Sequence, residues 1–174
     1  AKLAAVVALD EVLMRVRDAA NWRGSGGGVR YTSLANAAAD ATGDTAFERD
    51  VALDLMVATA RLWRSLGHHD TEGRFRIDGV TGPDEYSALA DNNVYTNLMA
   101  KRNLLGAVAA CERHQDEVRA LGVTPSELAS WRAAAENVVI PYDAKLGVHQ
   151  QSEGFTRHEP WDFEATRPDQ YPLL

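Results

Sequence analysis

Apolar residues recur at three- and four-residue intervals along much of the chain, which is the spacing of one face of an α-helix. Residues 2–20 carry this pattern and predict a first helix. The glycine-rich run over residues 24–28 predicts a loop, because glycine loses the most backbone freedom on ordering. Alanine-rich residues 32–42 predict a second helix. We therefore treat residues 1–30 as a helix with a glycine-rich loop, separate from residues 31–174.

A long helix is predicted between residues 45 and 66. Thr45 is followed three residues later by Glu48, which is the spacing of a capping box, and Gly67 ends the helix. Trp63 lies beside its apolar stripe. The stripe consists of Val51, Leu55, Ala58, Leu62 and Leu66.

The segment after this helix changes character. Residues 73–82 alternate briefly between polar and apolar side chains, which predicts a short strand and a turn, and residues 82–86 read as irregular loop. A third helix is predicted from Asn92 to His114. Its stripe contains Leu98, Leu105, Val108 and Glu112.

A second capping box opens the fourth helix of this series. Thr124 and Glu127 have the required spacing, and Pro125 occupies the first helical position, where a missing N–H costs nothing. The helix is predicted to run through Trp131 to about residue 138, and Pro141 ends it. The remainder reads as loop with one short strand near residues 148–152. The predicted fold class is all-α, with long helices and one short strand or turn.

Composition excludes several classes of protein. The net charge is -7 and the isoelectric point about 5.2, so the chain lacks the basic face of a nucleic-acid binder. Cys111 is the sole cysteine, which rules out an internal disulfide and predicts a core residue. His68 and His69 are adjacent and point in different directions, so no metal site is predicted. No apolar run reaches the roughly 18 residues that span a bilayer, and we expect a cytoplasmic protein.

Polar residues suited to carbohydrate chemistry are concentrated in one short region. Carboxylates and planar amides bind sugar hydroxyl groups, and aromatic rings bind sugar faces. Glu85 lies in a loop beside an aromatic residue, where its pKa can rise enough for it to protonate a glycosidic oxygen. The candidate site residues are Asp84, Glu85, Tyr86, Asp91, Asn92, Asn93, Tyr95 and Asn97.

A structural interpretation of the same residues stays open. Acidic and amide side chains before a helix commonly cap it, so Asp91, Asn92 or Asn93 could serve as the N-cap of the third helix. Asp84 could likewise shape the loop rather than bind a hydroxyl group.

Two joined motifs resemble glycoside hydrolase family 65, which contains maltose, trehalose and kojibiose phosphorylases and some trehalose hydrolases. Residues 82–86 read Gly-Pro-Asp-Glu-Tyr, and residues 91–97 read Asp-Asn-Asn-Val-Tyr-Thr-Asn. More weakly, residues 151–155 resemble a Gln-Phe-x-Gly-Phe element of the family, with Ser152 in place of the aromatic residue. The resemblance covers roughly residues 31–174.

The resemblance implies that residues 31–174 are part of an (α/α)6-barrel catalytic domain. It implies that Glu85 is the general acid and that Asp91, Asn92, Asn93, Tyr95 and Asn97 line or shape the sugar pocket. The implied reaction is inverting phosphorolysis of maltose, trehalose or kojibiose to β-glucose 1-phosphate. Inorganic phosphate is a co-substrate, and no metal or organic cofactor is implied.

The chain also departs from the family pattern. Residues 1–30 do not match the family's upstream sugar-binding segment, and its later glucose- and phosphate-binding elements do not occur in residues 1–174. The chain therefore reads as the middle of a larger enzyme. Two alternatives arise: hydrolysis of the same disaccharides, or a truncated module without catalysis. An incomplete barrel would expose apolar helix faces, so a homo-oligomer is a further expectation.

Overall fold

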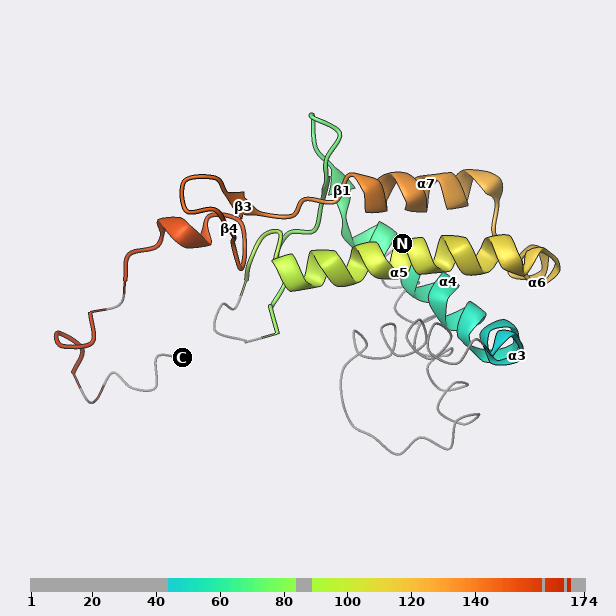
Figure 1. Ribbon diagram of the computed structural model, residues 1–174, viewed down its shortest axis with the longest axis horizontal. Coiled ribbons are helices and arrows are strands. Elements are labelled where there is room, and N and C mark those ends of the chain that lie inside the picture. The colour runs from blue at the N-terminus through green and yellow to red at the C-terminus, as the bar shows by residue number, and fades with distance from the viewer. Residues whose placement is uncertain (1–43, 84–88, 161, 168, 170–174) are drawn as a thin grey trace.

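The computed structural model describes residues 44–83, 89–160, 162–167 and 169. Three helices form its main body, and two small hairpins lie at one end of them (Figure 1). The largely helical architecture confirms the predicted fold class. The helices predicted over residues 2–20 and 32–42, and the boundary at residue 30, lie outside the described residues.

The first helical run extends from Thr45 to Leu66, as predicted. It consists of α3 (Thr45–Phe47), a π-helical turn η1 (Glu48–Ala52) and α4 (Leu53–Leu66). The predicted Thr45 cap is wrong by one residue. The Asp44 carboxylate accepts hydrogen bonds from the amides of Ala46 and Phe47, at 3.0 and 2.9 Å. A carboxylate satisfies these amides and also interacts favourably with the positive end of the helix, which explains its use as the cap.

Helix α4 is buried on more than its predicted stripe because both α5 and α7 contact it. Leu55, Ala58 and Trp63 are buried as predicted, whereas Leu62 and Leu66 are only partly buried. Thr59 is also fully buried. Its hydroxyl donates to the carbonyl of Leu55, which removes the cost of burying it.

Helix α5 (Val94–Arg113) runs antiparallel to α7 (Pro125–Glu136), and the short α6 (Gln115–Ala120) connects them (Figure 1). The stripe predicted for α5 is largely wrong, since Leu98 and Leu105 are 43% and 38% exposed. Mostly small side chains occupy the face against α4 and α7 instead, because they let the helices approach closely, and Val108 is the one member of the predicted stripe among them. That buried face contains Ala100, Leu104, Ala107, Val108 and Cys111.

The capping prediction for α7 is confirmed in part. The Thr124 hydroxyl accepts from the amide of Glu127 at 3.2 Å, and Pro125 is the first helical residue. The Glu127 carboxylate instead pairs with Arg61 through two bonds of 2.8 and 3.1 Å, which fastens α7 to α4. Trp131 is buried between the helices, as predicted.

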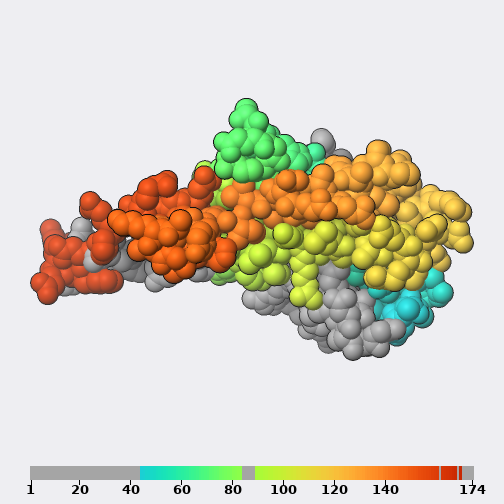
Figure 2. All heavy atoms as spheres, turned by 45° about the horizontal axis from the view of Figure 1, so that its top comes forward, coloured from blue at the N-terminus to red at the C-terminus, as the bar shows by residue number. Residues whose placement is uncertain are grey.

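Two short antiparallel hairpins accompany the helices. Strand β1 (His68–His69) pairs with β2 (Phe75–Arg76), and β3 (Tyr142–Asp143) pairs with β4 (Val148–His149). The short strands predicted within residues 73–82 and 148–152 are therefore present, although both are only two residues long. A 3-10 turn, η2 (Phe155–Arg157), comes next. This C-terminal segment extends beyond the helices (Figure 2).

The chain after α7 is bonded to β2. The amide of Phe75 donates to the carbonyl of Asn137 at 2.7 Å, and the amide of Val139 donates to the carbonyl of Phe75 at 2.9 Å. Phe75 and Ile77 are themselves fully buried in the helical core. The strand that leads into the residue 81–89 loop is thus fixed on both its backbone and its side chains.

A partly buried ion pair joins the start of the first helical run to the C-terminal end of α5. Glu48 accepts from Arg113 at 2.8 and 2.9 Å, and His114 Nε2 lies 2.8 Å from the same carboxylate. The hydrogen bond from Arg113 is the main reason that the pKa of Glu48 lies below its usual 4.5. Because the folded form holds the ionised carboxylate more strongly, this contribution is present at neutral pH. It is lost as the pH falls through that lowered value.

Cys111 is buried, as predicted, and desolvation raises the pKa of its thiol to about 11. A buried thiol in this protonation state packs as a small apolar side chain. Among the described residues, no helix combines the length and the hydropathy that a bilayer crossing needs.

Substitution of Gly67 tests how closely the end of α4 packs against β2. A Cβ atom added there would overlap the ring of Phe75 and lie 2.8 Å from the Arg76 carbonyl oxygen. We expect Gly67→Ala to lower the free energy of unfolding by about 3 kcal/mol, through overpacking against backbone and core. Urea unfolding measures the loss.

Gly122→Ala is the control for this measurement. Nothing lies within 4 Å of a Cβ at Gly122, and its φ of 65° costs only backbone strain. That strain is worth about 1 kcal/mol. A loss for Gly67→Ala no larger than for Gly122→Ala would contradict the proposed close contact.

Candidate substrate site

The chain enters and leaves the residue 81–89 loop at one backbone bridge. The amide of Val80 donates to the carbonyl of Ala90 at 3.0 Å, and the reverse bond is 2.8 Å. One step further out, the amide of Asn92 donates to the carbonyl of Ile77 at 2.9 Å. We call these bonds the loop base. Asp84, Glu85 and Tyr86 fall between its two sides in the sequence and lie outside the described residues.

Asn92 is the centre of the loop base. It is fully buried and has a φ of 48°, in the left-handed region that asparagine tolerates better than most residues. Its Oδ1 oxygen accepts from the amide of Ile77 and from the side chain of Asn97, each at 3.2 Å. Its Nδ2 group donates to Asp78 at 3.0 Å and to Glu153 at 2.8 Å. All four hydrogen-bonding positions of the side-chain amide are thereby used.

Asn97 and Asn93 have different positions at the start of α5. Asn97 is fully buried and donates to the carbonyl of Val139 at 2.7 Å. Within the described part of the chain, its Oδ1 oxygen has no hydrogen-bond partner. Asn93 caps α5, because its Oδ1 accepts from the amide of Thr96 at 3.1 Å. The capping interpretation thus holds for Asn93. The sugar-binding role of all three asparagines stays a prediction.

Asp91 and Tyr95 lie at the surface. The Asp91 carboxylate accepts from the amide of Gly79 at 2.9 Å, and its backbone carbonyl accepts from the amide of Glu153 at 2.9 Å. Tyr95 is 43% exposed on the first turn of α5. Of the predicted residues that are described, Asp91 and Tyr95 have the most solvent-accessible side chains.

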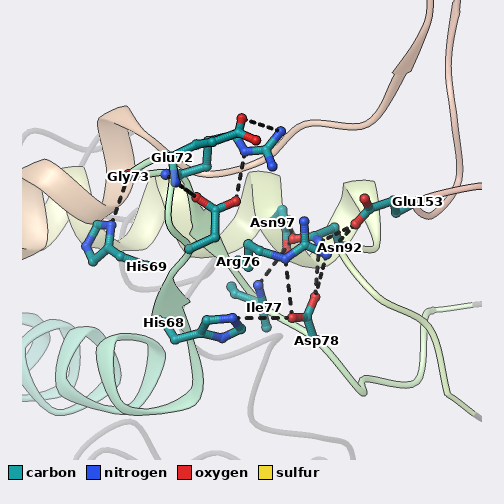
Figure 3. Close-up of polar contacts among 12 residues, drawn as sticks. His68, His69, Glu72, Gly73, Arg76, Ile77, Asp78, Asn92, Asn97 and Glu153 are labelled. Atoms are coloured by element: carbon teal, nitrogen blue, oxygen red, sulfur yellow. Dashed lines mark hydrogen bonds and ion pairs between the residues drawn. The ribbon is translucent and has the colours of Figure 1, made fainter.

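Charged residues that the sequence reasoning missed surround Asn92 (Figure 3). Arg76 Nη2 lies 2.5 Å from Glu153 Oε2 and 3.3 Å from Asp78 Oδ1, and His68 Nε2 lies 3.7 Å from Asp78. The hydrogen bond from Arg76 is the main reason that the pKa of Glu153 is lowered, and the bond from Asn92 acts in the same direction. Glu153 therefore stays ionised at neutral pH. The sequence contains one signal for Glu153, which is its position within residues 151–155, the segment that resembles the family's Gln-Phe-x-Gly-Phe element.

An open groove of about 470 Å³ begins at Pro83, two residues before Glu85. Tyr95 and Phe155 contribute aromatic rings to it, and both rings are partly exposed. Two glutamines, Gln150 and Gln151, also line it. The remaining lining residues are Asn93, Val94, Val148, His149 and Thr156. This mixture of aromatic and amide groups suits a sugar ring with its hydroxyl groups.

The groove wall is bonded to the start of α5. The amide of Val94 donates to the carbonyl of Gln151 at 2.9 Å. Within the wall, the amide of Thr156 donates to Gln150 Oε1 at 3.3 Å, while its hydroxyl donates to Asp143 at 2.5 Å. The bond from the Thr156 amide orients the Gln150 side chain, and the bond to Asp143 holds Thr156 in place. Among the described residues, no group of three or more His, Cys, Asp or Glu side chains is arranged to hold a metal ion.

Comparison with known proteins decides the family. Residues 29–174 match the family model described as the glycosyl hydrolase family 65 central catalytic domain. The chain belongs to glycosyl hydrolase family 65. The match covers the segment in which the two motifs and the groove occur, and the largely helical architecture is that of part of the family's (α/α)6 barrel.

Relatives within family 65 extend this assignment. An uncharacterized glycosyl hydrolase of Mycobacterium tuberculosis is 56% identical over 133 residues, covering 76% of this chain and 17% of the relative. The alpha,alpha-trehalose phosphorylase of Geobacillus stearothermophilus is 43% identical over 141 residues, covering 76% of this chain and 18% of that enzyme. The chain thus spans less than a fifth of the length of these relatives.

A solved structure agrees on the fold. It is described as a candidate kojibiose phosphorylase from the human microbiome, and it superposes with a TM-score of 0.69 at 24% identity. The superposition covers 82% of this chain and 22% of that one.

Replacement of Asn92 tests the loop base. Asn92→Ala removes four side-chain hydrogen bonds and leaves alanine in a left-handed conformation, so we expect a loss of about 3 kcal/mol in unfolding free energy. Asn92→Gly removes the same bonds without the backbone strain and should lose about 1 kcal/mol less.

Asn137→Ala is the matched control, because among the described residues that exposed side-chain amide bonds only to the carbonyl of Ala133 within its own helix. Chemical denaturation of the variants compares the losses. An Asn92→Ala loss as small as the control's is incompatible with a central role for this side chain.

Proposed function

We propose that this chain supplies the general-acid segment of an enzyme that phosphorolyses an α-glucosidic disaccharide with inversion. The observation that carries the proposal is the groove beside Pro83. It is lined by two partly exposed aromatic residues and two glutamines, and its lining residue Pro83 comes two residues before Glu85 in the sequence.

The proposed reaction has the chemistry of inverting enzymes. Glu85 donates a proton to the glycosidic oxygen as the bond from that oxygen to the anomeric carbon breaks. Phosphate forms the new carbon–oxygen bond on the opposite face, which gives β-glucose 1-phosphate and a free acceptor sugar. Phosphate is already a nucleophile, so this reaction needs no second carboxylate and no metal or organic cofactor.

The residues of the site divide into two groups in this proposal. Tyr95 is accessible in the groove, and we assign it to contact the sugar together with Asp84 and Tyr86 of the acid segment. Asn92 and Asn97 are fully buried, and we assign them to shape the pocket by holding the loop base. Asn93 lines the groove while capping α5, and Asp91 stands at the loop base beside it.

The relatives support a disaccharide substrate and suggest which one to assay first. A relative named as an alpha,alpha-trehalose phosphorylase shares 43% identity with the chain, so trehalose is our first choice, then kojibiose and maltose. Hydrolysis is the second candidate, because the relative at 56% identity carries the name glycosyl hydrolase. In that case another carboxylate would activate water in place of phosphate.

The remaining expectations stay proposals. A cytoplasmic location, a homo-oligomer and the alternative of a module without catalysis rest on the sequence. The exposed Leu98 and Leu105 on α5 favour contact with a further protein surface, either a second copy or another part of the same enzyme.

Glu85→Gln tests the proposed acid in the complete protein that carries this chain. Loss of the acidic proton should reduce kcat/KM for the disaccharide by about 10²–10⁴-fold while the protein still folds. The assay measures glucose 1-phosphate and glucose from trehalose, kojibiose and maltose, with and without phosphate. Glucose release independent of phosphate identifies a hydrolase instead.

Glu136→Gln serves as the control, because Glu136 is an exposed carboxylate on α7. It should leave turnover unchanged. Wild-type turnover that Glu85→Gln does not reduce would remove Glu85 from the mechanism.

A further inference from the structure

We propose that Arg76 and Glu153 are positioning residues that fix the loop base relative to the groove, and with it the two points from which the segment containing Glu85 (the acid loop) extends. This inference rests on the proposed function. Neither residue touches the reacting atoms in the proposed mechanism. They act through Asn92 and through the backbone on either side of the loop.

Glu153 connects two segments that are far apart in the sequence. Its Oε2 oxygen accepts from Asn92 Nδ2 at 2.8 Å and lies 2.5 Å from Arg76 Nη2, while its own amide donates to the carbonyl of Asp91. Its side chain and its backbone therefore both contact the loop base. Gln151 and Phe155, which both line the groove, lie two residues before and two residues after Glu153 in the sequence. Glu153 thus lies between groove-lining residues and is bonded to the loop base.

Arg76 closes the connection from the opposite side. Its guanidinium contacts Asp78 and Glu153, and only 17% of its side chain is exposed. Asp78 in turn accepts from Asn92 at 3.0 Å. Arg76 therefore draws together two carboxylates that both bind the Asn92 amide. A partly buried charge-assisted network of this kind holds its geometry more firmly than an exposed pair.

The position of this network determines what it can influence. Val80 and Ala90 form the backbone bridge on one side, and Gln150 and Phe155 line the groove on the other. A general acid works only when its proton lies within hydrogen-bond reach of the leaving oxygen. A shift of about 1 Å between the acid segment and the bound sugar can cost about 10²-fold in rate. The Arg76–Glu153 pair is placed to prevent such a shift.

The test compares two substrates in the complete protein that carries this chain. One is the disaccharide, whose leaving oxygen needs a proton. The other is α-glucosyl fluoride, from which fluoride leaves with its electron pair while phosphate forms the new bond, so that protonation matters far less. Glu153→Ala should reduce kcat for the disaccharide about 10–100-fold with KM changed less than about threefold. It should change turnover of the fluoride less than about threefold.

Matched variants separate positioning from stability. Arg76→Ala should show the same pattern as Glu153→Ala, and Glu153→Gln should be partly active because one oxygen remains to accept from Asn92. Asp116→Ala removes an exposed carboxylate from its pair with Arg119 and should behave as wild type. Equal loss of both substrates in Glu153→Ala, or no loss of either, would overturn the inference.

Glu85→Gln in the same assays tests the proposed function separately. It should show the substrate pattern of a missing proton donor. Full turnover of the disaccharide by Glu85→Gln, or no turnover by wild type, counts against the proposed function and not against the network.

Limited proteolysis tests the same inference by a measurement that does not depend on enzymatic activity. Leu89 is 76% exposed next to the loop base, so chymotrypsin can cleave there. Glu153→Ala should be cleaved at Leu89 several-fold faster than wild type and Asp116→Ala, and equal rates would contradict the coupling.

Discussion

The arrangement of this molecule around its candidate site depends on one buried amide. Asn92 adopts a left-handed backbone conformation and uses all four of its side-chain hydrogen bonds. These bonds reach the residues that follow β2, the first turn of α5, and Glu153, which lies between the groove-lining residues Gln151 and Phe155. A buried polar group without partners is costly, so the network is favourable only when all three segments are in place together. The packing of β2 against Gly67 and the pairing of Phe75 with Asn137 and Val139 hold the first of these segments.

This constraint acts at the end of the molecule where the hairpins lie. The helices form one layer, and the two hairpins lie at one end of it (Figure 1). Residues at the start of α5 and in β4 line the groove. The residues that carry the family motif are consequently of two kinds. Tyr95 is accessible to a ligand, whereas Asn92 and Asn97 act from inside the structure. A motif of this kind specifies the geometry of a site as much as its contacts.

Local signals in the sequence predicted much of the fold. Gly67 marks the end of the long helix, and the helical spacing of apolar residues predicts α5 up to His114. The three-residue spacing of Thr124 and Glu127 predicts the cap of α7. The cap at Asp44 was missed because Thr45 and Asp44 are both good N-caps and only the structure distinguishes them. Leu98 and Leu105 were assigned to the core because hydrophobicity was given more weight than size. Helices α4 and α7 both pack closely against α5, and this close approach favours alanine at the buried positions of α5.

The charged part of the site could not be predicted, because its members are distant in the sequence. Arg76 and Glu153 are 77 residues apart, and no local pattern joins them. Nor does the sequence reveal which asparagine of the Asn92–Asn93 pair caps α5, since both are equally good caps. The family motif directed attention to this region, but the division between Asn92 at the loop base and Asn93 at the helix cap is visible only in the structure.

Amide hydrogen exchange in the wild-type protein tests the central claim most directly. If Asn92 holds the loop base, the amides of Val80, Ala90 and Asn92 should be protected almost as strongly as those in the middle of α5, since they open only when the network breaks. The amide of Gly73, in the exposed turn of the first hairpin, provides the internal reference for a weakly protected site. Exchange at Val80, Ala90 and Asn92 as fast as at Gly73 would show that the loop base opens independently, which contradicts a central role for Asn92.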